Sequence, residues 1–163
     1  MGLRILRLIA LGLVLQFVAL PIAGANSASE VAVIVNKNTR VSSLSLRDLR
    51  SIFLGTKDSW PNGMRLTVVS LPVTRAETQT VLKEVCGMSD TDFKRYFLLM
   101  NFQGKSVSPP RMMPSAAGIK SYVSSTPGAI GVIPARDIDS SVEVMSIDGL
   151  KPGSPGYRLS MAQ

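Results

Sequence analysis

The stretch Thr67–Cys86, TVVSLPVTRAETQTVLKEVC, constrains the fold most, because it joins two elements with different periodicities. It begins as a short β-prone run, and after a connection of a few residues its apolar side chains recur at helical spacing. A strand that leads directly into a helix N-terminus is where α/β proteins commonly hold anions and small ligands. We therefore predict a strand over 65–70, a helix that opens at Thr74 and ends at Gly87, and a candidate binding site between them. The expected buried face of this helix is Thr78, Val81, Leu82 and Val85.

The rest of the chain repeats this alternation of strands and helices. Continuous apolar runs predict further buried strands over 31–35 and 129–133, and a more exposed one over 142–147. Capping residues at Ser45, Ser89 and Ser115 open three more helices. This pattern predicts an α/β fold, a three-layer sandwich around a central mixed or mostly parallel sheet.

Two further segments carry structural expectations. Phe93, Tyr96, Phe97 and Met100 lie on one helical face, which favours a place in the core over a ligand platform. The Gly- and Pro-rich segment over 103–114 is expected to be a long loop, either near a functional site or a simple connector. Trp60 is expected to fold back as an apolar plug.

The first 25 residues resemble a targeting segment. Arg4 and Arg7 precede the apolar run Leu8–Leu20, and Ala23-Gly24-Ala25 matches the small-residue pattern that signal peptidase cleaves. A transmembrane anchor is the alternative, but Pro21 and Gly24 favour cleavage. We predict a signal peptide over 1–25, a single domain over 26–163, and a periplasmic protein that is not integral to the membrane after cleavage.

Composition excludes several classes of function. The chain has no histidine, which rules out Ser-His and Cys-His catalysis and histidine metal sites. Its only cysteine, Cys86, is expected to be a buried thiol. Removing the predicted leader lowers the formal charge from +7 to +5, without a run of Lys or Arg, so a nucleic-acid partner is not expected. We expect neither an enzyme nor a cofactor or metal site.

Three segments together resemble a known family: VAVIVNKNTRVSSLSLRDLRSIFLGTKDSW, RLTVVSLP and STPGAIGVIPA. They occur in the order found in the phosphate-binding proteins of bacterial phosphate ABC transporters, which are type 2 periplasmic binding proteins. The resemblance covers most of residues 31–135. Full-length members have two lobes that close on the ligand, and this chain resembles one of them, so it lacks the second wall that would enclose an anion.

The resemblance also implies where a ligand would lie. The family's strand-end arginine falls on Ser70, and its Ser-Gly-Thr triplet falls on Thr74, Arg75 and Ala76. The loss of the arginine at Ser70 removes a charge-assisted hydrogen bond of about 1.5–3 kcal/mol. Arg75 is a candidate replacement cation. These four residues are the expected ligand-binding set.

The same residues have a purely structural interpretation. Thr74-Arg75-Ala76-Glu77 reads as a capping box, in which Thr74 caps the helix and the Glu77 carboxylate competes with phosphate. Asn36, Lys37, Asn38, Thr126 and Gly128 are expected to line the rim of the same site, or else to act only as turn residues.

Two functions follow as hypotheses. The first is an exported substrate-binding-protein-like domain that binds phosphate or another oxyanion weakly, or no longer binds it, and works with an ABC permease. The second is a periplasmic interaction or sensory module, partnered with a membrane sensor protein, that has kept the fold without the ligand.

Overall fold

The structure is a computed structural model, and it describes residues 29–161. The predicted signal peptide lies outside the described residues. Between residues 29 and 161 no helix is both long and apolar enough to cross a membrane.

The body is organised around a five-stranded mixed sheet with the strand order β4-β3-β5-β1-β6. The central strands β5 (Ala129–Pro134) and β1 (Val31–Val35) run antiparallel, with Val33 opposite Val132. On the other side of β5, β3 (Thr67–Ser70) is parallel to it. β4 (Arg111–Met112) pairs parallel with β3, and β6 (Glu143–Val144) pairs antiparallel with β1. The predicted mixed sheet is confirmed.

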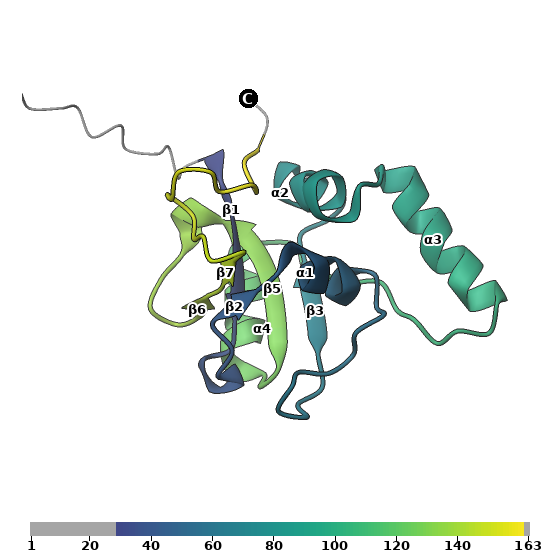
Figure 1. The fold of residues 1–163 in the computed structure, drawn as a ribbon, viewed down its shortest axis with the longest axis horizontal. Coiled ribbons are helices and arrows are strands. Elements are labelled where there is room, and N and C mark those ends of the chain that lie inside the picture. Colours follow the sequence, from purple (N-terminus) through teal and green to yellow (C-terminus); the bar gives the residue numbers. More distant parts are fainter. Residues whose placement is uncertain (1–28, 162–163) are drawn as a thin grey trace, which may run out of the picture.

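Helices cover both faces of this sheet, as the predicted three layers require (Figure 1). Because β1 and β5 are fully buried, each strand sends alternate side chains into two separate cores. Val31, Val33 and Val35 pack with α1 (Leu46–Phe53) and with the helix that begins as α2 (Ala76–Val81). Ala32 and Ile34 pack against α4 (Ala116–Ser125).

The helices begin where side-chain caps are available. Ser45, Ser89 and Ser115 each accept a hydrogen bond from the backbone N–H three residues on, at the starts of α1, α3 (Asp90–Phe102) and α4. After α2 the chain continues as a π-helical turn, Leu82–Cys86, which ends at Gly87 in the left-handed region. The predicted buried face of this helix is confirmed, and Cys86 is a buried thiol whose pKa burial raises to about 11.

Two sequence expectations were wrong in detail. The segment 103–114 is not a simple loop, because Arg111–Met112 forms the edge strand β4. The segment 142–147 is not one strand but two, since β6 belongs to the main sheet and β7 (Ser146–Ile147) pairs with β2 (Ser43–Leu44) in a separate two-stranded sheet. In both cases a two-residue strand carries too few residues to give a periodic signal.

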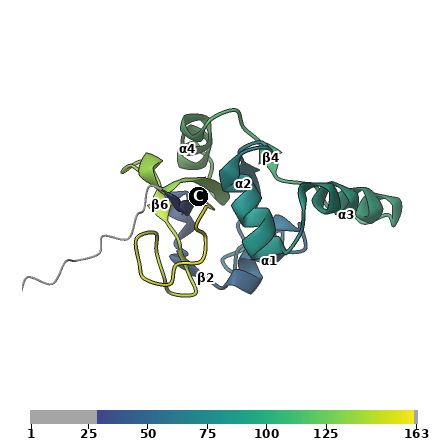
Figure 2. The same ribbon diagram turned by 90° about the horizontal axis from the view of Figure 1, so that it is seen from above.

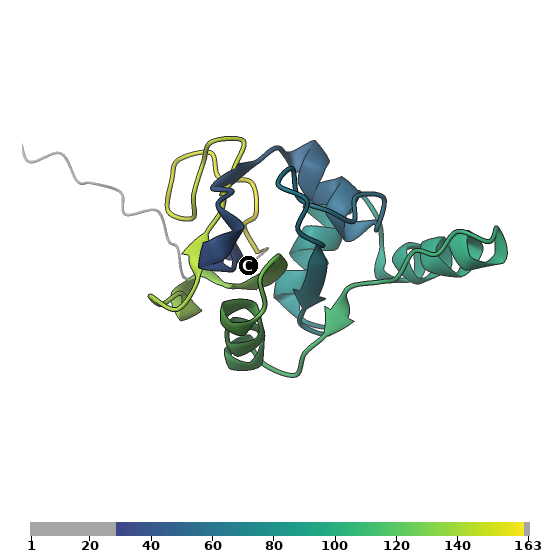
Figure 3. The ribbon, with the colours of Figure 1, turned by 90° about the horizontal axis from the view of Figure 1, so that it is seen from below.

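The helix α3 projects from the body as an arm, as seen from all three directions (Figures 1, 2 and 3). Its inner side chains Phe93 and Phe97 are buried and meet edge to face, with ring centroids 5.0 Å apart. Tyr96 and Met100, the other members of the predicted core stripe, are only partly buried. The stripe is therefore core at the base of the arm and less so towards its tip.

Candidate functional site

The topology divides the predicted site residues between the two ends of the central sheet. Since β3 and β5 are parallel, Ser70 and Pro134 end their strands at the same end of the sheet. β1 runs in the opposite direction, so Asn36–Asn38 follow it at the other end of the sheet. Thr126 and Gly128 also lie at that end, because they precede β5. A six-residue strand spans about 20 Å. The expectation that these residues line one common rim was therefore wrong.

At the end of the sheet that follows β1, the polar groups serve the fold. The buried Asn36 side chain donates to the carbonyls of Val123 and Ser124, at 2.8 and 2.9 Å, and accepts from the Asn38 backbone N–H. Asn36 thereby closes the C-terminal end of α4. Lys37 and Asn38 are exposed, and Thr126 ends α4 through its backbone.

Gly128 at this end is fixed by close packing. Its φ of +80° is a left-handed value, and an added Cβ would lie 2.3 Å from the Arg65 carbonyl oxygen. Its own carbonyl accepts a 2.9 Å hydrogen bond from the Trp60 indole N–H, which confirms that Trp60 folds back as a plug. The hydrogen bonds of Asn36 and the packing of Gly128 therefore support the structural interpretation of these residues.

At the other end of the sheet, the strand–helix junction differs from the predicted capping box. A turn closed by the Arg75 N–H and the Pro72 carbonyl, 2.9 Å apart, includes Thr74, so α2 begins at Ala76 and not at Thr74. Arg75 is the N-cap, and it forms no side-chain capping bond. The predicted cap by Thr74 was wrong, because the turn moves this exposed residue outside the helix. Ser70 is buried, and its carbonyl accepts from the Met113 N–H at 2.8 Å.

Glu77, in the first turn of α2, is the unusual residue of this junction. It is only 3% exposed, and one of its carboxylate oxygens, Oε2, accepts no hydrogen bond from the described part of the chain. Arg75 Nε lies 3.5 Å from Oε2, and Arg136 Nη2 lies 4.0 Å from Oε1. We call Arg75, Glu77 and Arg136 the Glu77 cluster. The predicted capping box required the Glu77 carboxylate to bond the backbone at the helix start, and Glu77 forms no such bond.

The sequence interpretation missed Arg136. It lies in the 3-10 turn Ala135–Asp137, directly after β5. Parallel neighbouring strands end at one edge of a sheet, so a cation just after β5 must lie near whatever follows β3. This rule could have identified Arg136 once the two strands were taken as neighbours.

The chemistry available to the Glu77 cluster is electrostatic. Two guanidinium groups next to the first turn of a helix favour an anion, and Glu77 supplies one from within the chain. A phosphate that approached Arg75 and Arg136 would meet this carboxylate and would have to displace it or accept its repulsion. No group of three metal-ligating side chains occurs in the part of the chain that the structure describes.

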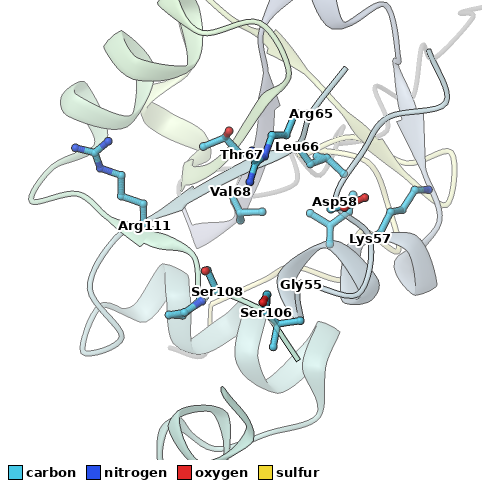
Figure 4. A pocket seen from close by; sticks show the side chains of 13 residues that line it. Gly55, Lys57, Asp58, Arg65, Leu66, Thr67, Val68, Ser106, Ser108 and Arg111 are labelled. Atoms are coloured by element: carbon cyan, nitrogen blue, oxygen red, sulfur yellow. The ribbon is translucent and has the colours of Figure 1, made fainter. Parts of the chain in front are cut away.

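A cavity of about 500 Å³ lies away from the Glu77 cluster, between β3, the end of α1 and the loop that precedes β4 (Figure 4). None of the predicted site residues lines it. Lys57 and Arg111 at its margin extend away from it: Lys57 bonds Asp48 at 2.9 Å, and Arg111 lies 5.4 Å from the Tyr122 ring centre. The Ser45 hydroxyl and Lys57 hold the pKa of Asp48 below its ordinary value. Two of the three cations that line the cavity are thus engaged elsewhere, and the third is Arg65.

No protein-family model matches the chain. Solved structures do resemble it. A Clostridium perfringens protein assigned as a phosphate ABC transporter substrate-binding protein, solved with bound phosphate, is 22% identical at a TM-score of 0.61, over 76% of this chain and 46% of that one. An ABC-type phosphate transport receptor from Vibrio cholerae is 19% identical (TM-score 0.53), over 76% and 48%. PstS from Borrelia burgdorferi is 11% identical (TM-score 0.63), over 81% and 54%.

These likenesses settle the architecture. The chain spans about half the length of the proteins that it resembles, as expected of a single lobe. The first two are named as phosphate transport proteins, and none of the three is named as an enzyme. The predicted resemblance is confirmed at the level of the fold: this chain has the architecture of one part of a phosphate ABC transporter substrate-binding protein.

Proposed function

We propose that the protein is a non-catalytic, single-lobe relative of phosphate-binding proteins that binds oxyanions weakly. The observation that carries this proposal is the Glu77 cluster at the junction of β3 and α2, where two arginines lie close to a helix start. The fold shared with phosphate-binding proteins supports phosphate as the ligand to test first. Ser70, Thr74, Arg75 and the backbone near Ala76 remain the proposed ligand contacts, together with Arg136.

Weak affinity follows from two features of the chain. The described residues form one lobe, and a ligand held by this lobe alone is exposed to water on one side, where electrostatic attraction is screened. Glu77 also neutralises part of the positive charge that would attract phosphate. Charge-assisted hydrogen bonds contribute about 1.5–3 kcal/mol each, so a resident carboxylate removes much of the gain from either arginine.

Calorimetric titration with inorganic phosphate tests the proposal. We expect a dissociation constant on the order of 1 mM, or about −4 kcal/mol. Arg75→Gln should weaken this binding further, because Arg75 is half exposed and close to the proposed ligand. Arg47→Gln is the matched control, since Arg47 is exposed on α1 and should not contribute. Absence of heat at several millimolar phosphate would remove the oxyanion function.

A second function, a periplasmic interaction or sensory module, is favoured by Glu77 itself. A carboxylate among the cations is the expected outcome if the fold has been kept and the ligand lost. Affinity capture from an envelope extract separates the two functions. A stable partner, retained equally with and without phosphate, supports the module, and a phosphate-dependent partner such as a permease supports transport.

Both functions place the protein outside the cytoplasm, and this part of the proposal rests on the leader over 1–25. Mass spectrometry of the protein from a periplasmic fraction should give a mature N-terminus near residue 26. A retained leader in the membrane fraction would support the anchor alternative.

A further inference from the structure

The tip of the α3 arm carries an apolar surface that the rest of the protein leaves uncovered. Three of the four exposed large apolar side chains in the described residues lie there: Leu98 is 57%, Leu99 49% and Phe102 80% exposed. Together with Arg95 they recur at i, i+3, i+4 and i+7, which places them on one side of the helix. The fourth, Met112, lies on β4 in the body. Contiguous exposed apolar surface of this kind marks an interaction site.

Buried side chains and backbone hydrogen bonds fix the position of this surface on the arm. Phe93 and Phe97, on the inner side of the helix, are buried, and Tyr96 meets Phe97 edge to face at 5.1 Å. At the tip, Gly104 N–H bonds the Asn101 carbonyl and Lys105 N–H bonds the Met100 carbonyl, both at 3.0 Å, so the chain turns back immediately. The exposed apolar side chains thus belong to the C-terminal half of α3, and this helix projects from the body (Figure 2).

Charge identifies the occupant of this surface. From Phe93 to Ala135 the sequence contains no Asp or Glu, but it contains five Lys or Arg residues. Of these, Lys94 pairs with Asp90 and Lys120 with Asp139. Arg95 and Lys105, which flank the apolar tip, are exposed and form no salt bridge with any residue that the structure describes. The tip is therefore both apolar and basic.

A helix end with Leu and Phe on one side and exposed cations beside them has the composition of an interfacial, lipid-binding segment. A second copy of the chain fits less well, because parallel arms would bring like charges together. In antiparallel arms the acidic partners, Asp90 and Asp92, are already bonded to Lys94 and Ser89. We propose that the tip of α3 binds the surface of an anionic lipid bilayer, with Leu98, Leu99 and Phe102 entering the interface and Arg95 and Lys105 contacting headgroups.

The test is binding to vesicles of phosphatidylglycerol and phosphatidylcholine, compared with pure phosphatidylcholine. The protein is purified from the periplasmic fraction, and its N-terminus is determined by mass spectrometry, so that all variants start at the same residue. Phe102→Ser should lower the partition coefficient about tenfold on anionic vesicles, given the transfer free energy of an exposed aromatic side chain. Arg95→Gln with Lys105→Gln should lower it about tenfold on anionic vesicles, and much less on neutral ones.

Met112→Ser is the control, because it removes a half-exposed apolar side chain from the body and not from the arm. Its binding should equal that of the wild type. Phe102→Trp adds a reporter to the buried Trp60, and its emission should shift to the blue and be quenched by brominated lipid. Three results overturn the proposal: equal binding to neutral and anionic vesicles, equal loss in Phe102→Ser and Met112→Ser, or concentration-dependent self-association that Phe102→Ser abolishes, without vesicle binding.

Discussion

The two ends of the central sheet carry similar polar residues but use them differently. At the Asn36 end, the side-chain donors of Asn36 and Trp60 bond backbone carbonyls, while the buried Thr39 hydroxyl has no hydrogen-bond partner in the described residues. At the α2 end, Glu77 is as deeply buried as Asn36, yet its Oε2 accepts no hydrogen bond from the described residues, and its arginine neighbours lie at 3.5 and 4.0 Å.

The difference distinguishes buried polar groups that stabilise the fold from buried polar groups that could bind a ligand. A buried polar group with all its partners satisfied stabilises the fold and leaves no capacity for a ligand. A buried group that lacks a partner costs free energy, and it marks a place where a ligand or a rearrangement could supply one. The comparison therefore assigns stability to Asn36. One buried oxygen of the described residues lacks a partner at each end, but only Glu77 is charged and lies near two arginines, so its junction is the place to test for a ligand. Four substitutions test this assignment.

Gly128→Ala should have the largest effect. The new Cβ would lie 2.3 Å from a backbone oxygen, and alanine disfavours a φ of +80°. We expect a loss of about 3–5 kcal/mol in the free energy of unfolding, measured by denaturant titration. Gly63→Ala is the control: its φ of +81° is the same, but it has no atom within 4 Å of an added Cβ, so it should lose only about 1–2 kcal/mol. Similar losses in the two variants would show that packing at Gly128 is unimportant.

Asn36→Ala comes next. It removes the donors to the Val123 and Ser124 carbonyls at the buried end of α4, and should cost about 2–3 kcal/mol in unfolding free energy. Asn38→Ala should stay within about 0.5 kcal/mol, because Asn38 contributes only its backbone N–H to this network. Phosphate titration of both variants should match the wild type. A change in phosphate affinity for Asn36→Ala would show that this end of the sheet contributes to phosphate binding.

Glu77→Gln tests the α2 end of the sheet, where the Glu77 carboxylate is expected to compete with phosphate. Neutralising the resident carboxylate removes its repulsion of an oxyanion near Arg75, and we expect phosphate affinity to rise about tenfold, or ~1.4 kcal/mol. Glu84→Gln is the control, since this partly exposed carboxylate lies 4.0 Å from Lys83 and belongs to a different part of the helix. Unchanged or weaker phosphate binding by Glu77→Gln would contradict competition by this carboxylate.

Thr74→Ala should have the smallest effect on stability, within about 0.5 kcal/mol, because Thr74 is exposed and does not cap α2. Ser89→Ala provides the scale. Its hydroxyl accepts from the Asp92 N–H at 3.1 Å as a true N-cap, and its loss should cost about 1 kcal/mol. Equal losses in the two variants would restore the predicted capping box.

The elements of the fold could be read from the sequence because they have strong periodic signals. The runs over 31–35 and 129–133 are uniformly apolar, as expected of strands buried on both faces, and Ser45, Ser89 and Ser115 mark helix starts that the structure confirms. The N-cap of α2 was misplaced by one residue, from Arg75 to Thr74. A local turn hydrogen bond competed there with a capping pattern that was equally plausible in the sequence.

The candidate site was predictable only in part. Sequence placed Ser70, Thr74, Arg75 and Ala76 at one strand–helix junction because they are neighbours along the chain. It did not reveal that β1 runs antiparallel to β5, which moves Asn36–Asn38 and Gly128 to the opposite edge. Nor did it reveal that Arg136, which lies 61 positions beyond Arg75, approaches the same carboxylate.

What the sequence determined by itself is therefore the set of elements, the burial of their faces and the absence of histidine chemistry, all of which depend on residue type and local spacing. The tertiary structure alone decided strand direction, the meeting of Arg75 and Arg136 at Glu77, and the exposure of the α3 tip. The physical reason is that periodicity shows which side of an element is apolar. It does not show which distant segment, if any, covers that side.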